Sequence, residues 1–280
     1  MASIRLKCGR SIGTSEHGDP KGSLLLWFHG TPGSRTWAPP DPEATRAAGV
    51  RIVVLERPGF GASDFQPDRR VLDWPSDVAH VADALGAERF AIAGVSGAGP
   101  YLAACAYALP ERVRAVGMIG VVAPLEAPGV RAGMTLRRRA LFRAARHAPR
   151  GAMLLRALGP ERIYRMMTSD APPCDRRVIE ATWIAKVAMT REAMRAGPRG
   201  YAWDLALATR PWGFPLEAIR VPVYIWHGER DVTTPVAMGR YLAAAIPGAR
   251  ARFLPDQGHF LSGAIWPELL ALVGATARRR

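Results

Sequence analysis

The stretch Phe90-Ala-Ile-Ala-Gly-Val-Ser96-Gly-Ala-Gly-Pro-Tyr101 decides the fold of this 280-residue chain. An apolar run typical of a buried strand leads to Ser96, and a helix-like sequence follows at once. Gly94 and Ala98 are small, so the backbone can turn sharply and hold the serine hydroxyl at the apex. Amides that open a helix here point toward whatever the serine attacks. The stretch predicts a nucleophilic serine, although serine is also a common helix cap.

A serine hydroxyl is a weak nucleophile and needs a base, which an acid must orient. His259 is the candidate base, because it follows a short apolar run in a loop near the C-terminus. Asp231 is the candidate acid, since it lies in a polar loop directly after the strand-like run 221–227. Glu126 and Asp256 are alternative acids and rank below it. Asp256 is too close to the histidine in sequence to approach it from the far side.

A second glycine-rich loop, His29-Gly-Thr-Pro-Gly, follows the apolar run that begins at Ser23. A loop of this kind supplies a backbone N–H to a developing oxyanion, and Thr31 is the candidate donor. Gly97, directly after the serine, is the candidate for the other donor. Pro32 has no N–H and cannot fill this role. His29 is expected to hold the loop rather than to act as a base.

Together these motifs resemble the α/β-hydrolase superfamily, in particular its serine-nucleophile members, and the resemblance covers nearly the whole chain. The matching segments are His29-Gly-Thr-Pro-Gly for the oxyanion loop, Glu56-Arg-Pro-Gly-Phe-Gly-Ala-Ser63 after the following strand, Gly94-Val-Ser-Gly-Ala for the nucleophile turn, His227-Gly-Glu-Arg-Asp231 for the acid loop, and Gly258-His259-Phe260 for the base loop. Serine, acid and histidine also occur in the family's order. Ala98 and Glu56 depart from its usual glycine and aspartate.

The resemblance implies an α/β-hydrolase fold, with a mostly parallel sheet covered by helices on both faces and an inserted helical cap. Apolar patterning agrees, because strands and helices alternate and the central strands are apolar on both faces. Strands are expected at about 23–29, 51–56, 90–95, 114–122, 221–227 and 251–254, and helices at about 41–48, 75–86, 97–109, 235–245 and 264–277, after an antiparallel pair within 3–16. The expected domains are a core of residues 1–126 and 216–280 and a cap of residues 127–215.

The interval 127–215 breaks the alternation and contains about three helices' worth of Ala, Met, Leu and Arg. Seven of its apolar side chains could line a flexible pocket: Met134, Leu141, Phe142, Met153, Met166, Met167 and Met189. Packing in the cap's own core is the favoured role for most of them. Trp203, Trp212 and Phe214 are expected where the cap returns to the sheet, as pocket walls or as hinge packing. The candidate substrate-binding residues are Trp203, Phe214 and Phe260.

The formal net charge is +14, and much of it lies in what we call the arginine cluster. Its ten members are Arg131, Arg137, Arg138, Arg139, Arg143, Arg146, Arg150, Arg156, Arg162 and Arg165. A solvated cap surface is the favoured interpretation. Contact with an anionic substrate or a phospholipid surface comes second. Nucleic acid is not an expected partner, because no recognised binding module accompanies the charge.

Composition predicts a cytoplasmic enzyme without metal or cofactor. Cys8, Cys105 and Cys174 are far apart and form no CxxC pair, so they are expected to be free thiols. The N-terminus has no apolar segment typical of a signal peptide, and no apolar run is long enough to span a bilayer.

The motifs and the resemblance favour hydrolysis of a small or medium apolar ester through an acyl-enzyme on Ser96. Serine at this turn argues against epoxide hydrolase and haloalkane dehalogenase relatives, which use aspartate there. A proline-iminopeptidase-like amidase is the next alternative, although it would need a cap acid to bind a free amine, and this cap is poor in acids. A carbon–carbon bond hydrolase or acyltransferase with the same triad stays open. A non-catalytic ligand-binding protein is the alternative from another class.

Overall fold

An eight-stranded sheet organises the part of the chain that the structure describes, residues 2–147 and 158–277 of a computed structural model. The strands are β1 (Ala2–Arg5), β2 (Ser11–Gly18), β3 (Ser23–Phe28), β4 (Val50–Leu55), β5 (Phe90–Val95), β6 (Val113–Ile119), β7 (Val223–Gly228) and β8 (Arg250–Leu254). Their order in the sheet is β1-β2-β4-β3-β5-β6-β7-β8. β1 pairs antiparallel with β2 and β2 with β4, whereas β3 to β8 run parallel to one another. This confirms the mostly parallel sheet.

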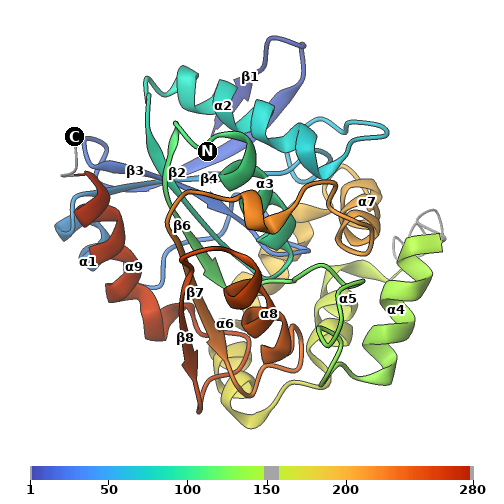
Figure 1. Cartoon of the computed structure of the whole chain (residues 1–280). Helices are drawn as coiled ribbons and strands as arrows, with labels where there is room; N and C mark the ends of the chain where they lie inside the picture. Colours follow the sequence, from blue (N-terminus) through green and yellow to red (C-terminus); the bar gives the residue numbers. More distant parts are fainter. Residues whose placement is uncertain (1, 148–157, 278–280) are drawn as a thin grey trace.

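Helices cover both faces of the sheet (Figure 1). α2 (Trp74–Ala84), α3 (Gly99–Ala108) and α8 (Val236–Ala245) pack on one face, and α1 (Pro42–Ala47) and α9 (Ser262–Ala277) on the other. Side chains of β5 alternate between the two layers, as they must in a pleated strand. Phe90 and Ile92 enter one apolar core, and Ala91 and Ala93 enter the other. Burial on both faces explains why the strand reads as a continuous apolar run.

Two predicted ends differ from the structure for local backbone reasons. β6 ends at Ile119 rather than at 122, because Gly120 takes a φ of +53° and turns the chain out of the sheet. The helix expected from 97 begins at Gly99, since Ser96–Ala98 form a single turn of 3₁₀ helix before it. Short 3₁₀ turns are common at the N-termini of α-helices.

Between β6 and β7 the described residues form four helices, where the sequence indicated about three. They are α4 (Leu136–His147), α5 (Gly159–Thr168), α6 (Pro173–Ala193) and α7 (Arg199–Ala208). Prolines separate the last three, since Pro173 opens α6 and Pro198 precedes α7. α5 packs on α6 and α4 on α7. In Figure 1, α4, α5 and α7 lie on the opposite side of the molecule from α1 and α9. The domain boundaries at 127 and 215 stay a prediction.

The turn after β5 leaves no room for a side chain at Gly94. A Cβ there would lie 2.4 Å from Phe28 O and 2.9 Å from the Ala98 Cβ. The backbone of β3 therefore touches that of β5 at this point, which a larger residue would prevent.

We expect Gly94→Ala to lower the free energy of unfolding by about 1–3 kcal/mol, because the added methyl overpacks this contact. Gly274→Ala in α9 is the matched control, since a Cβ at Gly274 would meet nothing within 4 Å. That control should stabilise the helix by up to about 1 kcal/mol. Urea unfolding of the three proteins measures both changes, and equal unfolding midpoints for the two variants would contradict the expectation.

Candidate active site

Ser96 occupies a strained turn between β5 and α3. Its φ is +56°, and in residues 2–147 and 158–277 only Asp68 joins it as a non-glycine residue with positive φ. A left-handed backbone costs free energy in a residue with a side chain, and it is held only where the surroundings enforce it. Val122 N, in the segment after β6, donates to Ser96 O at 2.9 Å and holds the turn from the neighbouring strand. The sharp strand-to-helix turn expected from the sequence is therefore present.

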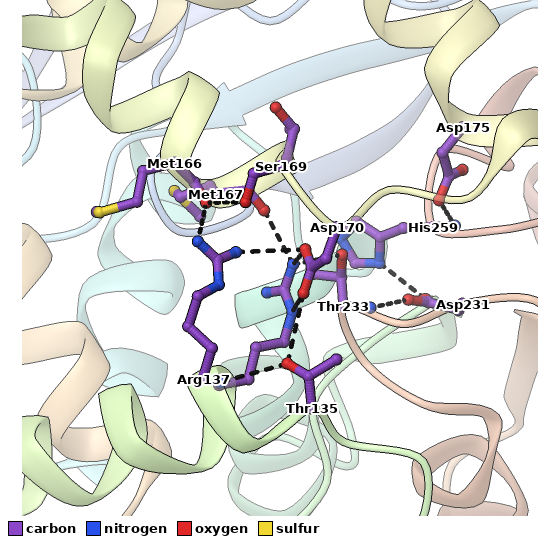
Figure 2. A network of polar contacts seen from close by, with 12 residues as sticks. Thr135, Arg137, Met166, Met167, Ser169, Asp170, Asp175, Asp231, Thr233 and His259 are labelled. Carbon is purple, nitrogen blue, oxygen red and sulfur yellow. Dashed lines mark hydrogen bonds and ion pairs between the residues drawn. The ribbon is translucent and has the colours of Figure 1, made fainter.

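Asp231 and His259 meet at the same edge of the sheet, because they follow the parallel neighbours β7 and β8. A hydrogen bond of 2.8 Å joins His259 Nδ1 to Asp231 Oδ2 (Figure 2). Asp231 Oδ1 accepts from the backbone N–H groups of Thr233 at 2.7 Å and Thr234 at 2.8 Å. Burial would raise the pKa of Asp231, but His259 and these hydrogen bonds lower it overall. A buried, ionised carboxylate can orient an imidazole and balance its charge.

The other acids considered for this role lie away from His259. Glu126 is exposed, and Asp256 forms an exposed ion pair with Arg230 at 2.7 Å. Asp231 is the carboxylate bonded to the imidazole among the residues that the structure describes.

Two cavities open on either side of Ser96, and both include Thr31, Met167 and Thr233 in their walls. The apolar cavity, with a volume of about 130 Å³, is lined further by Gly97, Leu141, Phe142, Met166 and Leu205. The histidine cavity, with a volume of about 110 Å³, is lined further by Tyr164, Lys186, Met189, His259 and Phe260. Ser96 and His259 thus share one cavity. No hydrogen bond joins their side chains in the described part of the chain.

The two candidate oxyanion donors lie side by side. A Cβ on Gly97 would be 2.3 Å from Thr31 Oγ1 and 3.3 Å from Thr31 N. The loop after β3 therefore touches the first residue after the serine, and a side chain at Gly97 would push it away.

Arg57, which the sequence reasoning did not assign to the site, holds this loop by hydrogen bonds. Its guanidinium donates to His29 O at 2.6 Å, to Gly30 O at 3.0 Å and to Thr31 Oγ1 at 2.9 Å. The ring of the buried His29 is bonded on both sides, since Nε2 accepts from Arg57 N at 3.2 Å and Nδ1 bonds Gly30 O of its own loop at 2.6 Å. Burial lowers the pKa of His29 well below its usual range, and the Arg57 charge lowers it further.

Asp204 of α7 is the second residue that the sequence reasoning missed. Its buried carboxylate accepts from Arg57 Nε at 2.7 Å, from Arg69, from Tyr101 Oη at 2.7 Å and from Thr31 Oγ1 at 3.1 Å. Burial would raise the pKa of Asp204, but the two guanidinium groups and the tyrosine hydroxyl lower it to about 2. A single acid among the apolar residues 201–208 was the available signal, because such a residue is rarely buried without a partner.

Asp175 of α6 holds the histidine loop in the same way. Its carboxylate accepts from the backbone N–H of His259 at 2.9 Å and of Phe260 at 3.0 Å. Gly258 permits this approach, since a Cβ there would lie 2.3 Å from Asp175 Oδ2. Figure 2 shows Asp175 beside the loop that carries His259. The helical insertion thus contributes one buried aspartate to each of two site loops.

Of the three candidate substrate-binding residues, only Phe260 lines one of these cavities. Trp203 and Phe214 lie outside both linings, which agrees with the packing role that the sequence also allowed. Trp203 donates from Nε1 to Arg69 O at 2.9 Å and packs edge-on against Phe65. Phe214 stacks on Tyr107 with ring centroids 5.1 Å apart. Both side chains, Trp203 and Phe214, pack against the large hydrophobic core beside the sheet.

The apolar side chains of the insertion divide between cavity walls and core. Those that line a cavity are Leu141, Phe142, Met166, Met167 and Met189. Met134 is buried in the large core beside α2 and α3, and Met153 lies outside the described residues.

Part of the arginine cluster is paired rather than free. Arg137 and Arg138 reach Asp170 at 3.3 and 2.9 Å, as Figure 2 shows for Arg137, and both line the apolar cavity. Arg165 pairs with Glu161 at 3.0 Å on the exposed side of α5. Arg150 and Arg156 lie outside the described residues.

Comparison with known proteins identifies the family. The model for the alpha/beta hydrolase fold matches residues 23–263. The chain belongs to this family. Over 116 residues it is 31% identical to epoxide hydrolase B of Mycobacterium tuberculosis, and the match spans 40% of this chain and 32% of that protein. The chain thus spans about a third of the length of the curated relative that it matches.

Solved structures share the fold along the whole chain. An enol-lactonase from Burkholderia xenovorans LB400 superposes with a TM-score of 0.71 at 21% identity and 99% coverage of both chains. An esterase from Rhodococcus sp. ECU1013 gives a TM-score of 0.70 at 23% identity, covering 99% of this chain and 98% of the other. At this identity the likeness extends to the fold alone.

Neither a metal site nor a membrane span is evident where the chain is described. Within 2–147 and 158–277, no three His, Cys, Asp or Glu side chains are grouped to hold a metal ion. Over the same ranges, no helix combines the length and apolarity needed to cross a bilayer.

We expect Asp204→Asn to lower the free energy of unfolding by about 3–5 kcal/mol, because it leaves the buried Arg57 and Arg69 without a carboxylate. Glu161→Gln is the matched control, since its pair with Arg165 is exposed. The control should cost about 1 kcal/mol or less. Urea unfolding at neutral pH measures both losses, and losses of similar size would show that the buried pair is no more important than the exposed one.

Acid should also weaken this network in the wild type. The pKa of Asp204 is about 2 in the folded protein, below the ordinary 3.8. At pH values above the ordinary pKa, the ionised form of Asp204 therefore stabilises the folded protein. This stabilisation is lost as pH falls from about 4 to about 2. The difference amounts to about 2 kcal/mol. Unfolding free energies across this interval should fall more steeply for wild type than for Asp204→Asn; parallel curves would contradict the assignment.

Proposed function

We propose that this protein is a serine carboxylesterase that cleaves esters with a small or medium apolar acyl group. The observation that carries the proposal is the position of Ser96. It occupies a strained turn and shares a cavity with an imidazole that is hydrogen-bonded to a buried carboxylate. A hydroxyl at such a turn, a base and an orienting acid are the components of nucleophilic acyl transfer.

The proposed reaction proceeds in two halves. His259 Nε2 takes the Ser96 hydroxyl proton as Oγ attacks the ester carbonyl carbon, and Asp231 balances the imidazolium charge. The backbone N–H groups of Gly97 and Thr31 bind the oxyanion. His259 then protonates the leaving alcohol as the carbon–oxygen bond breaks. Water, deprotonated by His259, releases the acid from Ser96 and restores the free serine.

The cavities favour a particular orientation of the ester. The general acid must lie beside the leaving oxygen, and His259 lines the histidine cavity but not the apolar one. The alcohol therefore occupies the histidine cavity. The acyl chain extends into the apolar cavity, where Leu141, Phe142 and Met166 offer apolar contact.

An aminopeptidase-like amidase is supported less well. Such an enzyme needs a free carboxylate for the substrate's amine, and the described linings contain one acid, Asp204. This acid is committed to two arginines. An epoxide hydrolase is also disfavoured, despite the partial match to one, because the turn carries Ser96 where that chemistry uses aspartate.

The direct test is covalent labelling with a fluorophosphonate, followed by intact-protein mass spectrometry. We expect a single adduct on wild type and none on Ser96→Ala, because only an activated serine attacks the probe at an appreciable rate. Asp231→Asn should label far more slowly, since it loses the partner that orients the imidazole.

Asp256→Asn is the matched control for the acid, because Asp256 lies near His259 in sequence but pairs with Arg230 on the surface. It should label at the wild-type rate, and butyrate esters should turn over only in variants that label. A folded wild type that neither labels nor hydrolyses esters would reject the proposal in favour of a ligand-binding protein.

A further inference from the structure

Lys186 is a cation in the wall of the histidine cavity. It lies on α6 and is partly buried. The chain contains two other lysines, Lys7 and Lys21, and both are exposed. Almost every other basic residue of the chain is an arginine, so a lysine is an unusual choice at this position.

The ammonium group has no carboxylate partner in the part of the chain that the structure describes. Its described contact is with the ring of Phe260, whose centroid is 5.8 Å from Nζ. Arg137 and Arg138 of the neighbouring apolar cavity differ in this respect, since both form ion pairs with Asp170. Burial lowers the pKa of Lys186, because the ammonium has lost water without gaining an anion. An anion bound beside it would remove this penalty.

A second polar group in the same wall is also unsatisfied. Tyr164 lines the histidine cavity, and its buried hydroxyl has no hydrogen-bond partner among the described residues. Buried polar groups are nearly always hydrogen-bonded, so an exception calls for a ligand or water. An ammonium and a hydroxyl are both donors, and a carboxylate can accept from both.

We infer that the leaving alcohol of the substrate carries a carboxylate, which Lys186 binds in the histidine cavity. This inference rests on the proposed function, because the orientation of the ester follows from protonation of the alcohol by His259. The substrates are esters of an apolar acid with a hydroxy acid. Water adds across the ester bond, so the products are the apolar acid and the free hydroxy acid, with its carboxylate unchanged.

Two esters, one anionic and one neutral, test the inference. Each kcat/KM is divided by the rate constant for hydroxide hydrolysis of the same ester, which removes the difference in leaving-group reactivity. 4-Carboxyphenyl butyrate and 4-carbamoylphenyl butyrate share the acyl group and the shape of the leaving group, but only the first is an anion. We expect wild type to have the higher kcat/KM for the carboxylate. In Lys186→Met, which keeps the length of the side chain without its charge, the ratio of the two kcat/KM values should fall roughly 10-fold or more.

Two further variants separate local binding from general electrostatics. Lys21→Met removes an exposed lysine and should leave the ratio at the wild-type value. Lys186→Arg keeps the charge and should retain a preference for the carboxylate. A ratio that is unchanged in Lys186→Met, or a wild type that prefers the neutral ester, would overturn the inference.

Product inhibition of wild type gives a second measurement that does not depend on the folding of any variant. 4-Hydroxybenzoate should inhibit hydrolysis of the neutral ester at lower concentration than 4-hydroxybenzamide does, and equal inhibition would count against the carboxylate site. Failure of the proposed function has a different signature, in which wild type hydrolyses neither ester and forms no fluorophosphonate adduct.

Discussion

The buried ion pair between Asp204 and two arginines connects the parts of the molecule that a catalytic site would need to keep in register. Asp204 lies on α7 of the helical insertion, whereas Arg57 follows β4 and donates to the loop that carries Thr31. Arg57 and Asp204 are 147 residues apart in sequence. Charges removed from water are costly unless they are closely paired and fully hydrogen-bonded. The network therefore fixes the insertion relative to the loop that carries Thr31, which gives it a positioning role as much as a stabilising one.

Asp175 applies the same constraint to the other side of the site. It accepts from the backbone of the histidine loop, while Asp231 holds the imidazole itself. The loops after β3 and β8 are thus each fixed by an aspartate from the insertion, and Ser96 lies between them on the rigid turn after β5. A strained φ at Ser96 is tolerable because the strand before it and the helix after it are both buried.

Local pattern was enough to predict most strands and helices and the turn at Ser96, because strand and helix periodicity, glycine and proline act over a few residues. The helices on both faces of the sheet were implied by the resemblance to the family. The pairing of Asp231 with His259 remained an inference from order along the chain. Arg57, Asp175 and Asp204 were missed because their partners are distant in sequence, and a single charged residue does not indicate which loop it will contact. The role of Trp203 stayed open for a similar reason, since an aromatic ring between insertion and sheet fits either a cavity wall or the packing beneath it.

The acids of the insertion also explain the charge of the cavities. The sequence between 127 and 215 has few acids, and its aspartates are already engaged: Asp170 with two arginines, Asp175 with backbone amides, and Asp204 with Arg57 and Arg69. None is left to bind a cation, while Lys186 lies in the histidine cavity without an acidic partner in the described chain. The aspartates that hold the loops therefore do not pair with Lys186, and its ammonium group keeps the capacity to bind an anion in the histidine cavity.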